Sequence, residues 1–334
     1  MTTAEALDTY LAAHAAEIAQ AAERIAPHVR RTPLLETDLA SELLLKPECF
    51  QPTGSFKVRG AFNAVLKLAE NAATLPKGVL TVSSGNHAQA LALAARTAGI
   101  PATILIPQDA NPAKIAATRA LGAHVITENV TFANREERLR EVQRETGYTV
   151  VHPYDNWDII HGQGTAAREI LEDRPDVGLI VTPTGGGGLL CGSALAAKSH
   201  DRTVKVVGVE PERAADAAAT LRTREIQRLP DSPDTMADGV RTIAIGQANF
   251  EVMVTRGLVD DVVTVTEDEI GGATALLWTR AKLAIEPTAA LPLAAYLAGK
   301  LPETRRGDGH APISLVLSGG NFNPTLISRL LTTP

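Results

Sequence analysis

The sequence predicts an α/β fold in which helices accompany a mainly parallel sheet, organised as about two domains. Two observations indicate this class. Short β-rich runs alternate with Ala-rich helical stretches over most of the chain, and helices follow nearly all of the runs. A length of 334 residues is enough for about two domains. A chain of this size buries roughly 75% of the surface of its unfolded form, so a large core is expected.

The first thirty residues predict an amphipathic helix. Glu5, Asp8, Glu17 and Glu23 lie among apolar residues there, so a secretory signal peptide is not indicated. Farther along, apolar runs of strand length are followed by turn residues such as Gly, Pro, Asn and Ser. The clearest predicted strands are "GVLTVSS" (78–84), "ATILIPQ" (102–108), "HVITEN" (124–129), "VGLIVTPT" (177–184), "VKVVGVE" (204–210) and "ISLVLSGG" (313–320).

Composition narrows the classes of function. A content of 45% apolar and 21% charged residues is ordinary for a globular protein, and a net charge of −6 argues against a nucleic-acid-binding face. The longest apolar stretch is interrupted by Arg96 and Pro101, so no membrane span is expected. Cys49 and Cys191 are far apart and form no CxxC pair, which fits a reducing compartment. We therefore expect a cytoplasmic protein that binds neither nucleic acid nor a membrane.

A lysine lies where local electrostatics disfavour it. In "QPTGSFKVRGA" (51–61), residues Pro52 to Ser55 predict a turn that ends in a helix cap, and Lys57 follows in the first turn of the helix. The apolar face of this helix consists of Phe56, Ala61, Phe62, Val65, Leu66 and Ala69. The helix dipole disfavours an ammonium at Lys57 by about 0.3–1 kcal/mol. Lys57 is either a surface residue or, because a positive potential lowers its pKa, an amine kept neutral as a nucleophile.

Three stretches of the sequence each predict a strand, followed by a turn of small residues and then a helix. In open α/β sheets such turns lie at the carboxyl ends of strands, where ligands bind, and the helix starts expose backbone N–H groups. Together with Lys57, these turns predict a site for one anionic ligand. The repeated stretches are "VLTVSSGNHAQALALAA", "LIVTPTGGGGLLCGSALAA" and "SLVLSGGNFNPTLISRL".

The tetraglycine of the second turn is the strongest local signal. Its residues are Gly185, Gly186, Gly187 and Gly188. Consecutive glycines after a strand predict a close approach of the main chain to a phosphate, and a tight turn is the alternative. No Gly-Lys-Ser/Thr follows, so this is not a Walker loop. A dinucleotide (NAD) site is a minor alternative, because Leu190 or Cys191, depending on register, stands where that pattern needs a small residue.

The first turn, "SSGNHAQA" (83–90), offers hydroxyl, amide and imidazole groups at a helix start. This set suits a substrate carboxylate, with charge-assisted hydrogen bonds of about 1.5–3 kcal/mol each. Taken alone, a capped turn with a structural His87 fits as well. Ser318, which precedes the glycines of the third turn, would by itself be interpreted as a cap.

These blocks in this order resemble the serine/threonine dehydratase and serine racemase family of fold-type II pyridoxal-phosphate enzymes. The resemblance runs from about Thr32 to Asn321, through "TGSFKVRGA", "SSGNHAQALA", "GQGT", "TGGGGLL", "GVEPERAADA", "ADGV", "LVDDVVTVTEDEI", "IEPTAA" and "LSGGN". It implies an architecture similar to the tryptophan synthase β chain, with mostly parallel open sheets and helices on both faces. Residues 1–74 and 152–334 would form a large cofactor-binding domain, and residues 75–151 a small inserted domain. Enzymes of this type usually form homodimers.

The resemblance also implies the roles of individual residues toward pyridoxal 5′-phosphate. Lys57 would hold the cofactor as a Schiff base, Phe56 would pack near its ring and Asn86 would bond its 3-oxygen. The tetraglycine and Leu189 would cradle the phosphate with backbone N–H groups. Ser318 would meet the pyridine nitrogen, and because a neutral hydroxyl does not keep that nitrogen protonated, elimination is favoured over transamination. The residues implied to hold the substrate carboxylate are Ser83, Ser84, Asn86 and His87.

The implied function is conversion of L-serine or L-threonine type β-hydroxy amino acids to 2-oxo acids and ammonia, with Lys57 as the base that removes the Cα proton. A serine racemase is an alternative, with Ser84 as the acid/base group on the opposite face. A 3-hydroxyaspartate ammonia-lyase is another, with Arg135 binding the distal carboxylate, although a surface arginine is the simpler interpretation. Remote alternatives are an NAD-dependent oxidoreductase, disfavoured by Leu190, and a non-enzymatic amino-acid-binding protein, disfavoured by the full set of cofactor residues.

The block "GVEPERAADA" (208–217) carries an implied divalent cation site. In the family it would consist of the carboxylates of Glu210 and Asp216 and the carbonyl of Ala214, oxygen ligands that suit Mg²⁺, Ca²⁺ or Mn²⁺. Spacing alone predicts only an acid at a strand end and an acid on a helix surface. In "HPYDNWDIIHGQGT" (152–165), Asn156, Trp157 and His161 depart from the family's usual residues, so the wall that sets substrate specificity stays unassigned.

Overall fold

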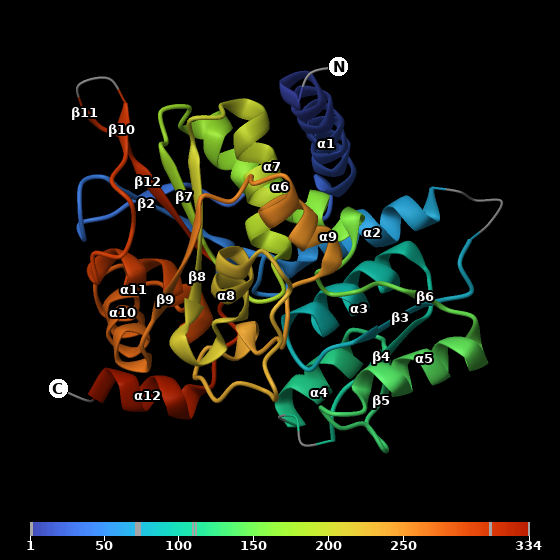
Figure 1. Cartoon of the computed structure of the whole chain (residues 1–334). Coiled ribbons are helices and arrows are strands. Elements are labelled where there is room, and N and C mark those ends of the chain that lie inside the picture. The colour runs from blue at the N-terminus through green and yellow to red at the C-terminus, as the bar shows by residue number, and fades with distance from the viewer. Residues whose placement is uncertain (1–2, 71–74, 109, 111, 307–308, 333–334) are drawn as a thin grey trace.

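Two open sheets organise the chain (Figure 1). The structure is a computed structural model that describes residues 3–70, 75–108, 110, 112–306 and 309–332. The larger sheet has the strand order β1-β2-β12-β7-β8-β9, and its strands run parallel except β1, which is antiparallel to β2. Their bounds are β1 Leu35–Glu36, β2 Leu43–Pro47, β7 Leu179–Pro183, β8 Lys205–Pro211, β9 Asp261–Val265 and β12 Ile313–Leu317.

The smaller sheet contains four parallel strands in the order β5-β4-β3-β6. They are β3 Val79–Val82, β4 Ala102–Leu105, β5 His124–Ile126 and β6 Thr149–Val150. Two further short strands, β10 (Arg305–Arg306) and β11 (Gly309–His310), form an antiparallel pair. The six predicted strands correspond to β3, β4, β5, β7, β8 and β12, which confirms the mainly parallel α/β fold.

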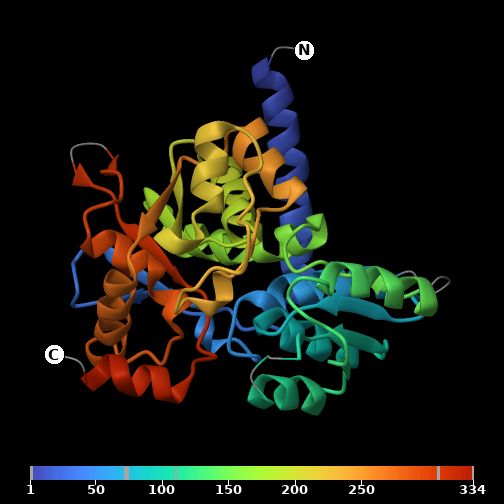
Figure 2. The ribbon, with the colours of Figure 1, turned by 60° about the horizontal axis from the view of Figure 1, so that its bottom comes forward.

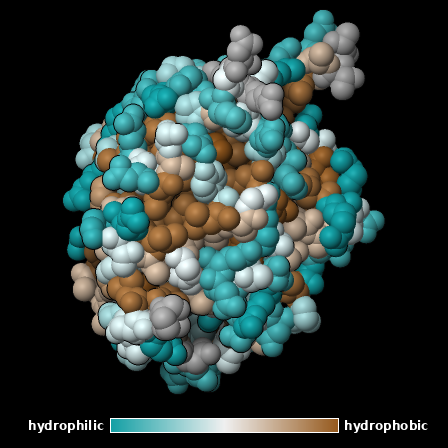
Figure 3. All heavy atoms as spheres, turned by 90° about the vertical axis from the view of Figure 1, so that its left-hand side faces the viewer, coloured by the Kyte–Doolittle hydropathy of each residue, from teal (hydrophilic) through white to brown (hydrophobic). Residues whose placement is uncertain are grey.

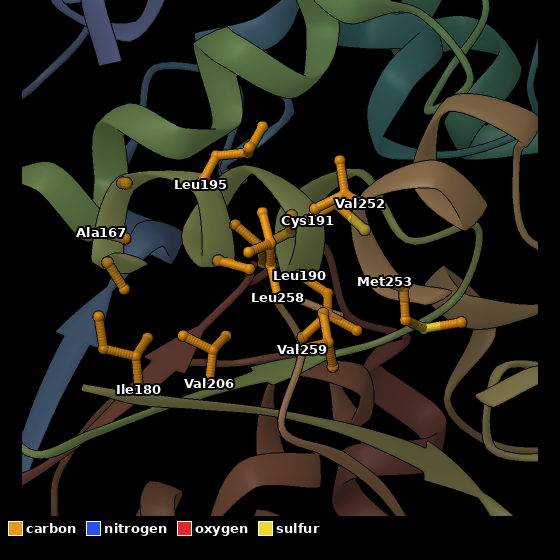
Figure 4. Close-up of a cluster of buried hydrophobic side chains, with 14 of the residues drawn as sticks. Ala167, Ile180, Leu190, Cys191, Leu195, Val206, Val252, Met253, Leu258 and Val259 are labelled. Atoms are coloured by element: carbon orange, nitrogen blue, oxygen red, sulfur yellow. The ribbon is translucent and has the colours of Figure 1, made fainter. Parts of the chain in front are cut away.

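Helices cover both faces of the larger sheet. On one face α6 (Trp157–Asp173) and α7 (Gly188–His200) pack over β7 and β8, where Ile180 and Val206 share one core with Leu190, and Leu195 lies on the side of α7 away from the sheet (Figure 4). On the other face the alternate residues of the same strands, such as Val181 and Val207, pack with α10 (Glu267–Thr279) and α11 (Leu291–Leu297). Successive strand side chains point to opposite faces. Both faces are covered, so β2, β7 and β12 are buried at every residue and their sequences are mainly apolar rather than alternating.

The predicted N-terminal amphipathic helix is confirmed as α1 (Thr3–Ile25). Its residues Leu11, Ile18, Ala21 and Ile25 are buried. The helix contacts α6 and α7, and its N-terminal end projects beyond the rest of the molecule (Figure 2). Across the part of the chain that the structure describes, none of the helices combines the length and the apolar run needed to cross a membrane.

The helix that carries Lys57, α2 (Lys57–Ala69), joins the two sheets. It packs against α6 and also against α3 (Asn86–Ala98), where Phe62 and Val65 share one core with Leu91. The predicted domain boundary at 74 and 75 adjoins residues 71–74, which lie outside the described residues. The division into domains therefore stays a prediction, and α2 shares its core with the segment predicted to be inserted.

A buried ion cluster fixes the first turns of α2. Arg59 donates to Glu48 at 2.7 and 2.8 Å and to Glu169, in α6, at 2.7 and 2.8 Å. Lys46, in β2, donates to the same Glu169 at 2.6 Å. Removing one member would leave an unpaired buried charge, which costs about 3–5 kcal/mol. The cluster therefore holds α2 to β2 and α6 immediately after Lys57.

The remaining helices lie around these layers. Their bounds are α4 Pro112–Ala120, α5 Arg135–Thr146, α8 Asp216–Thr223, α9 Gln247–Phe250 and α12 Pro324–Thr332. On one side of the molecule apolar residues gather in the middle of the face, with polar residues around them (Figure 3). Among the large apolar side chains, Leu297 at the end of α11 is 51% exposed.

Candidate active site

The strand ends of the larger sheet bring two of the predicted turns together. The tetraglycine follows β7 and Ser318 follows β12, and these two strands are parallel neighbours. The first turn, after β3 of the smaller sheet, reaches the same place through Asn86, whose Oδ1 accepts a hydrogen bond from Asn321 at 2.8 Å. The three turns therefore lie together beside the ends of strands from both sheets, and their convergence on one anionic ligand stays a prediction.

Lys57 begins α2 beside this edge. Its Nζ donates to the carbonyl oxygen of Pro153 at 2.9 Å and lies 5.1 Å from the centre of the Phe56 ring. Burial lowers the pKa of Lys57 to about 8, while the Glu286 carboxylate opposes the shift. The expected depressed pKa is confirmed, and its main cause is burial of the amine.

The predicted helix cap at Ser55 is wrong. Phe56 occupies the position before α2 with helical φ and ψ of −55° and −21°, and no described side chain caps the helix. Ser55 instead pairs with Gly319 in an isolated bridge. Its hydroxyl is buried without a hydrogen-bond partner among the described residues. The turn residues before Lys57 therefore serve to join this segment to the strand end that carries Ser318.

Ser318 is held directly against the lysine segment. The Phe56 N–H donates to the Ser318 carbonyl at 3.0 Å, and the Gly320 N–H donates to Gly54 at 2.8 Å. The Ser318 side chain is 2% exposed, and its Oγ contacts no hydrogen-bonding group within the described part of the chain. A buried hydroxyl in this state has its capacity available for a ligand. The hydroxyl is not a cap.

The tetraglycine is shaped by close contacts as well as by its position. A Cβ on Gly186 would lie 2.2 Å from the Tyr154 ring, and Gly187 has a φ of +97°. The Asn249 side chain donates to the Gly186 carbonyl at 2.9 Å and to the Tyr154 carbonyl at 3.0 Å. The first N–H groups of α7, which starts at Gly188, lack partners inside the helix. They form the positive end of a helix, which favours an anion.

The residues after β3 differ in exposure. Ser84 is exposed, and Ser83 and Asn86 are half-buried. His87 is 2% exposed, and its Nε2 is 3.1 Å from the Val151 carbonyl. Burial lowers the pKa of His87 to about 3, so its ring is neutral. This placement fits one of the two interpretations of His87 from the sequence, that of a structural histidine. The other interpretation, that His87 binds a substrate, stays a prediction.

Glu286 is a central residue to which sequence reasoning gave no role. It accepts from the Asn86 side chain at 2.8 Å and from the Asn321 N–H at 3.2 Å. Burial raises its pKa to about 7, and Asp238 adds to the shift. A glutamate before Pro287, at the start of a short helix, was the available signal. Tyr154 and Asn249 were missed as well, because their contacts depend on the tertiary fold.

Arg135 is more enclosed than a surface arginine. Its side chain is 18% exposed, and its guanidinium lies 3.7 Å from the centre of the Phe132 ring. Burial lowers the pKa of Arg135, opposed by Glu136 and Tyr154. Burial also lowers the pKa of His152, and the charges of Lys57 and Arg135 act in the same direction. Arg135 and Lys57 therefore both lie within electrostatic reach of His152.

Glu210 and Asp216 form a pair of buried acids. Glu210, near the end of β8, accepts from the N–H groups of Ala217 at 3.1 Å and Ala218 at 2.9 Å. Neither oxygen of Asp216 has a hydrogen-bond partner in the described chain, and Ala214 is buried beside it. Burial raises the pKa of Asp216 to about 7 and, together with Asp216, that of Glu210. Glu210 matches its prediction as a strand-end acid. Asp216 is buried rather than on a helix surface, and such an oxygen set fits a divalent cation.

Pyridoxal phosphate fits the groups at the strand ends. Lys57 offers an amine with a lowered pKa, the glycine loop offers a helix start for a phosphate, and Ser318 offers a buried hydroxyl without a partner among the described residues. The site therefore combines a nucleophile, a site for an anion and a polar group that can contact a ring nitrogen. The donor set therefore suits a phosphorylated aldehyde.

Comparison with known proteins assigns the family. Residues 25–319 match the family described as pyridoxal-phosphate dependent enzyme. A serine racemase from Oryza sativa subsp. indica is 40% identical over 92% of this chain and 90% of its own length. The L-threo-3-hydroxyaspartate ammonia-lyase of Saccharomyces cerevisiae is 40% identical over 95% of each. The crystal structure of a threonine deaminase from T.th. superposes with a TM-score of 0.84 at 46% identity, covering 92% of this chain and 98% of that one. The chain therefore belongs to the pyridoxal-phosphate-dependent enzyme family, in the group that contains threonine deaminases and serine racemases.

Proposed function

We propose that this protein is a pyridoxal-phosphate-dependent ammonia-lyase that converts L-serine or L-threonine type β-hydroxy amino acids to 2-oxo acids and ammonia. The observation that carries the proposal is the position of Lys57. Its amine has a pKa lowered to about 8 and lies beside the strand end where the Ser318 hydroxyl is buried without a partner among the described residues. An amine with this pKa is partly neutral near pH 7–8, as a nucleophile and a base require.

The cofactor, when bound, supplies the electron withdrawal that acidifies the Cα–H bond of the amino acid. The Lys57 amine then accepts the Cα proton. Ser318 would offer the ring nitrogen a neutral hydroxyl, which would favour prompt loss of the β-hydroxyl over transamination, the hydroxyl departing as water with a proton from the cofactor phosphate or a nearby donor. Ser83, Ser84 and Asn86 are the donors we assign to the substrate carboxylate, because they line the start of α3 with their side chains at least partly exposed.

Racemisation is a second candidate activity of the same site. Inversion requires a proton donor on the face of Cα opposite Lys57. Ser84 is exposed at the end of the β3 turn, so its hydroxyl is accessible to a bound substrate. The similarity to serine racemases supports this candidate.

A dicarboxylic substrate, 3-hydroxyaspartate, is the remaining candidate. The enclosed Arg135 guanidinium, held over Phe132, supports it, because an arginine that is already ordered binds a carboxylate without losing its own conformational freedom. The similarity to a 3-hydroxyaspartate ammonia-lyase points in the same direction.

We propose further that Glu210, Asp216 and the Ala214 carbonyl bind Mg²⁺, or Ca²⁺ or Mn²⁺ in its place. The two buried carboxylates support this metal site.

We also propose that the protein forms a homodimer, supported by the apolar area on one face (Figure 3). A cytoplasmic location is supported by the free thiols of Cys49 and Cys191.

One assay tests the proposed catalytic activities. Cofactor-loaded protein with Mg²⁺ is given L-serine, D-serine, L-threonine and both 3-hydroxyaspartate diastereomers, and both 2-oxo acid and inverted amino acid are measured. We expect 2-oxo acid from at least one L-β-hydroxy amino acid and none from Lys57→Ala. If none of these substrates yields 2-oxo acid, the proposed ammonia-lyase activity is refuted.

Two variants separate the candidates. If racemisation occurs, Ser84→Ala abolishes inversion and retains elimination. If 3-hydroxyaspartate is the substrate, Arg135→Gln lowers its kcat/KM by about 10- to 150-fold, equal to the 1.5–3 kcal/mol of a charged hydrogen bond, and leaves L-serine turnover unchanged. An equal loss for both substrates would exclude Arg135 as the contact to the distal carboxylate.

A further inference from the structure

A second group of metal-ligating side chains lies on the other side of α2 from the smaller sheet, between α1 and α6. His14 and Glu17 lie one turn apart on α1, and Asp158 and His161 lie one turn apart on α6. On a helix, residues three apart share one face. Ligand atoms of Glu17, Asp158 and His161 all lie within 4.8 Å of one another. The Nδ1 of His14 lies 2.8 Å from the Nε2 of His161.

His161 is only partly satisfied: its Nε2 shares a hydrogen bond with His14 and its ring stacks on that of Trp157, but its second ring nitrogen is unpaired within the described residues. It is 4% exposed, and its Nδ1 has no hydrogen-bond partner in the described structure. An imidazole nitrogen that has no hydrogen-bond partner within the described residues can serve as a metal ligand.

A cation already occupies the carboxylate side of this group. Lys67, on α2, donates to Glu17 at 2.9 Å and to Asp158 at 2.8 Å. Its side chain is 36% exposed, so the ammonium can leave the two carboxylates for solvent. Ion pairs this exposed contribute about 0–1 kcal/mol, which makes them easy to exchange. The Lys67 ammonium pairs with the two acids, while the two imidazoles share a hydrogen bond with each other.

We infer that Glu17, Asp158, His161 and His14 form a binding site for one divalent transition metal ion of the zinc class, which Lys67 vacates when the metal binds. Two imidazole nitrogens with two carboxylate oxygens are a donor set that suits Zn²⁺ and Co²⁺ and is too rich in nitrogen for Mg²⁺ or Ca²⁺. Ligands at about 2.0–2.2 Å from a tetrahedral ion lie roughly 3.3–3.6 Å apart. The ligand atoms of Glu17, Asp158 and His161 already lie within 4.8 Å of one another, and the two imidazole nitrogens must separate from 2.8 Å, a change that side-chain rotation provides.

The site differs from the active site and from the Glu210 and Asp216 pair. Its ligands come from α1 and α6, and none of them is among the groups assigned to cofactor or substrate. The metal would join α1 to the first turns of α6. This helix begins shortly after Pro153, whose carbonyl accepts a hydrogen bond from the Lys57 amine. Metal binding therefore adds a crosslink behind the segment that carries Tyr154.

The test uses cofactor-loaded protein in millimolar Mg²⁺, which fills oxygen-only sites. Zn²⁺ binding is measured by equilibrium dialysis, and Co²⁺ is added separately to observe the visible absorption of a tetrahedral nitrogen and oxygen site. We expect one Zn²⁺ per chain that Mg²⁺ does not displace. His161→Ala weakens it by more than about 100-fold, beyond the 10- to 100-fold that loss of an outer partner causes.

Three further variants keep the inference falsifiable if His161→Ala does not fold. Glu17→Gln removes a ligand at a half-exposed position and loses the same Zn²⁺ equivalent. Lys67→Gln removes the competing ammonium and tightens Zn²⁺ binding. His124→Ala, at an exposed histidine of β5, is the matched control and retains full binding. Absence of the Zn²⁺ equivalent in the parent protein, or its persistence in both His161→Ala and Glu17→Gln, would overturn the inference.

Discussion

The backbone N–H of Phe56 donates a hydrogen bond to the carbonyl oxygen of Ser318 across 3.0 Å. This bond joins the residue before Lys57 to the strand end whose hydroxyl is buried without a partner among the described residues. It explains how two motifs at opposite ends of the sequence form one site. Main-chain contacts therefore fix the backbone of the lysine segment against the backbone of Ser318, and the Lys57 amine is held separately by its hydrogen bond to the Pro153 carbonyl.

Gly186 tests the shape of the phosphate loop. Gly186→Ala places a Cβ 2.2 Å from the Tyr154 ring, so the ring or the loop must move. We expect a loss of about 1–3 kcal/mol in the free energy of unfolding, typical of overpacking, together with weaker cofactor retention. Urea denaturation and cofactor titration by absorbance measure the two effects.

Controls for this prediction come from the same chain. A Cβ added at Gly272, in α10, would meet no described atom within 4 Å, so Gly272→Ala should leave stability unchanged or raise it by about 0.5–1 kcal/mol. Adding Tyr154→Ala to Gly186→Ala removes the contacted ring and should restore the loop. Unaltered stability in Gly186→Ala alone would show that the contact is not tight.

Ser318→Ala separates folding from cofactor binding. Because the Oγ has no partner among the described residues, its removal should leave the stability of the cofactor-free protein unchanged. Loss of one hydrogen bond to the cofactor, about 0.5–1.5 kcal/mol, should weaken cofactor binding by about 2- to 12-fold. Ser314→Ala is the matched control, since Ser314 lies on the same strand with a hydroxyl that also lacks a partner in the described chain. Equal cofactor affinity in the two variants would exclude Ser318 from the binding site.

The buried acids predict an unusual dependence of stability on pH. The pKa of Asp216 is raised by burial to about 7, whereas an unfolded aspartate titrates near 4. Between about pH 4 and 7 the folded protein thus holds a proton that the unfolded chain has released. The free energy of unfolding then falls as pH rises through this window.

A divalent cation should remove this dependence. Mg²⁺ favours the ionised carboxylates, so its stabilising effect should grow from pH 5 to pH 7.5. Urea denaturation of the parent protein and of Asp216→Asn, with and without Mg²⁺, measures this. A Mg²⁺ effect that is equal at both pH values, or undiminished in Asp216→Asn, would contradict a site at Glu210 and Asp216.

The sequence predicted elements and motifs well because they depend on local patterns. Apolar runs bounded by turn residues located the strands, and the glycines after β7 and the lysine at the start of α2 marked the site. Partners that depend on the tertiary fold could not be predicted. Glu286 meets Asn86 only because two distant segments converge, and Asp216 is buried although it begins a short helix, where an acid is ordinarily exposed.

Two further differences have local causes. Ser55 has the residue type of a cap, but its pairing with Gly319 takes it away from the helix start. Arg135 looks like a surface residue in a highly charged helix, yet the aromatic ring of Phe132 lies under its guanidinium. In each case a contact outside the local pattern decided the position.

The lowered pKa of Lys57 predicts how cofactor capture depends on pH. The neutral amine attacks an aldehyde, and its fraction rises as pH increases through about 8. The second-order rate of capture by cofactor-free protein, followed by visible absorbance, should rise from about pH 6.5 and level off above about pH 9. A rate that continues to rise in proportion to hydroxide toward about pH 10.5 would indicate an ordinary lysine.

Peptide mapping of cofactor-supplemented protein after borohydride reduction decides whether Lys57 holds the cofactor covalently. We expect a phosphopyridoxyl group on the peptide that contains Lys57 and no label on that peptide in Lys57→Arg. A label confined to any other lysine, or an unlabelled Lys57 in protein that has retained the cofactor, would contradict this expectation.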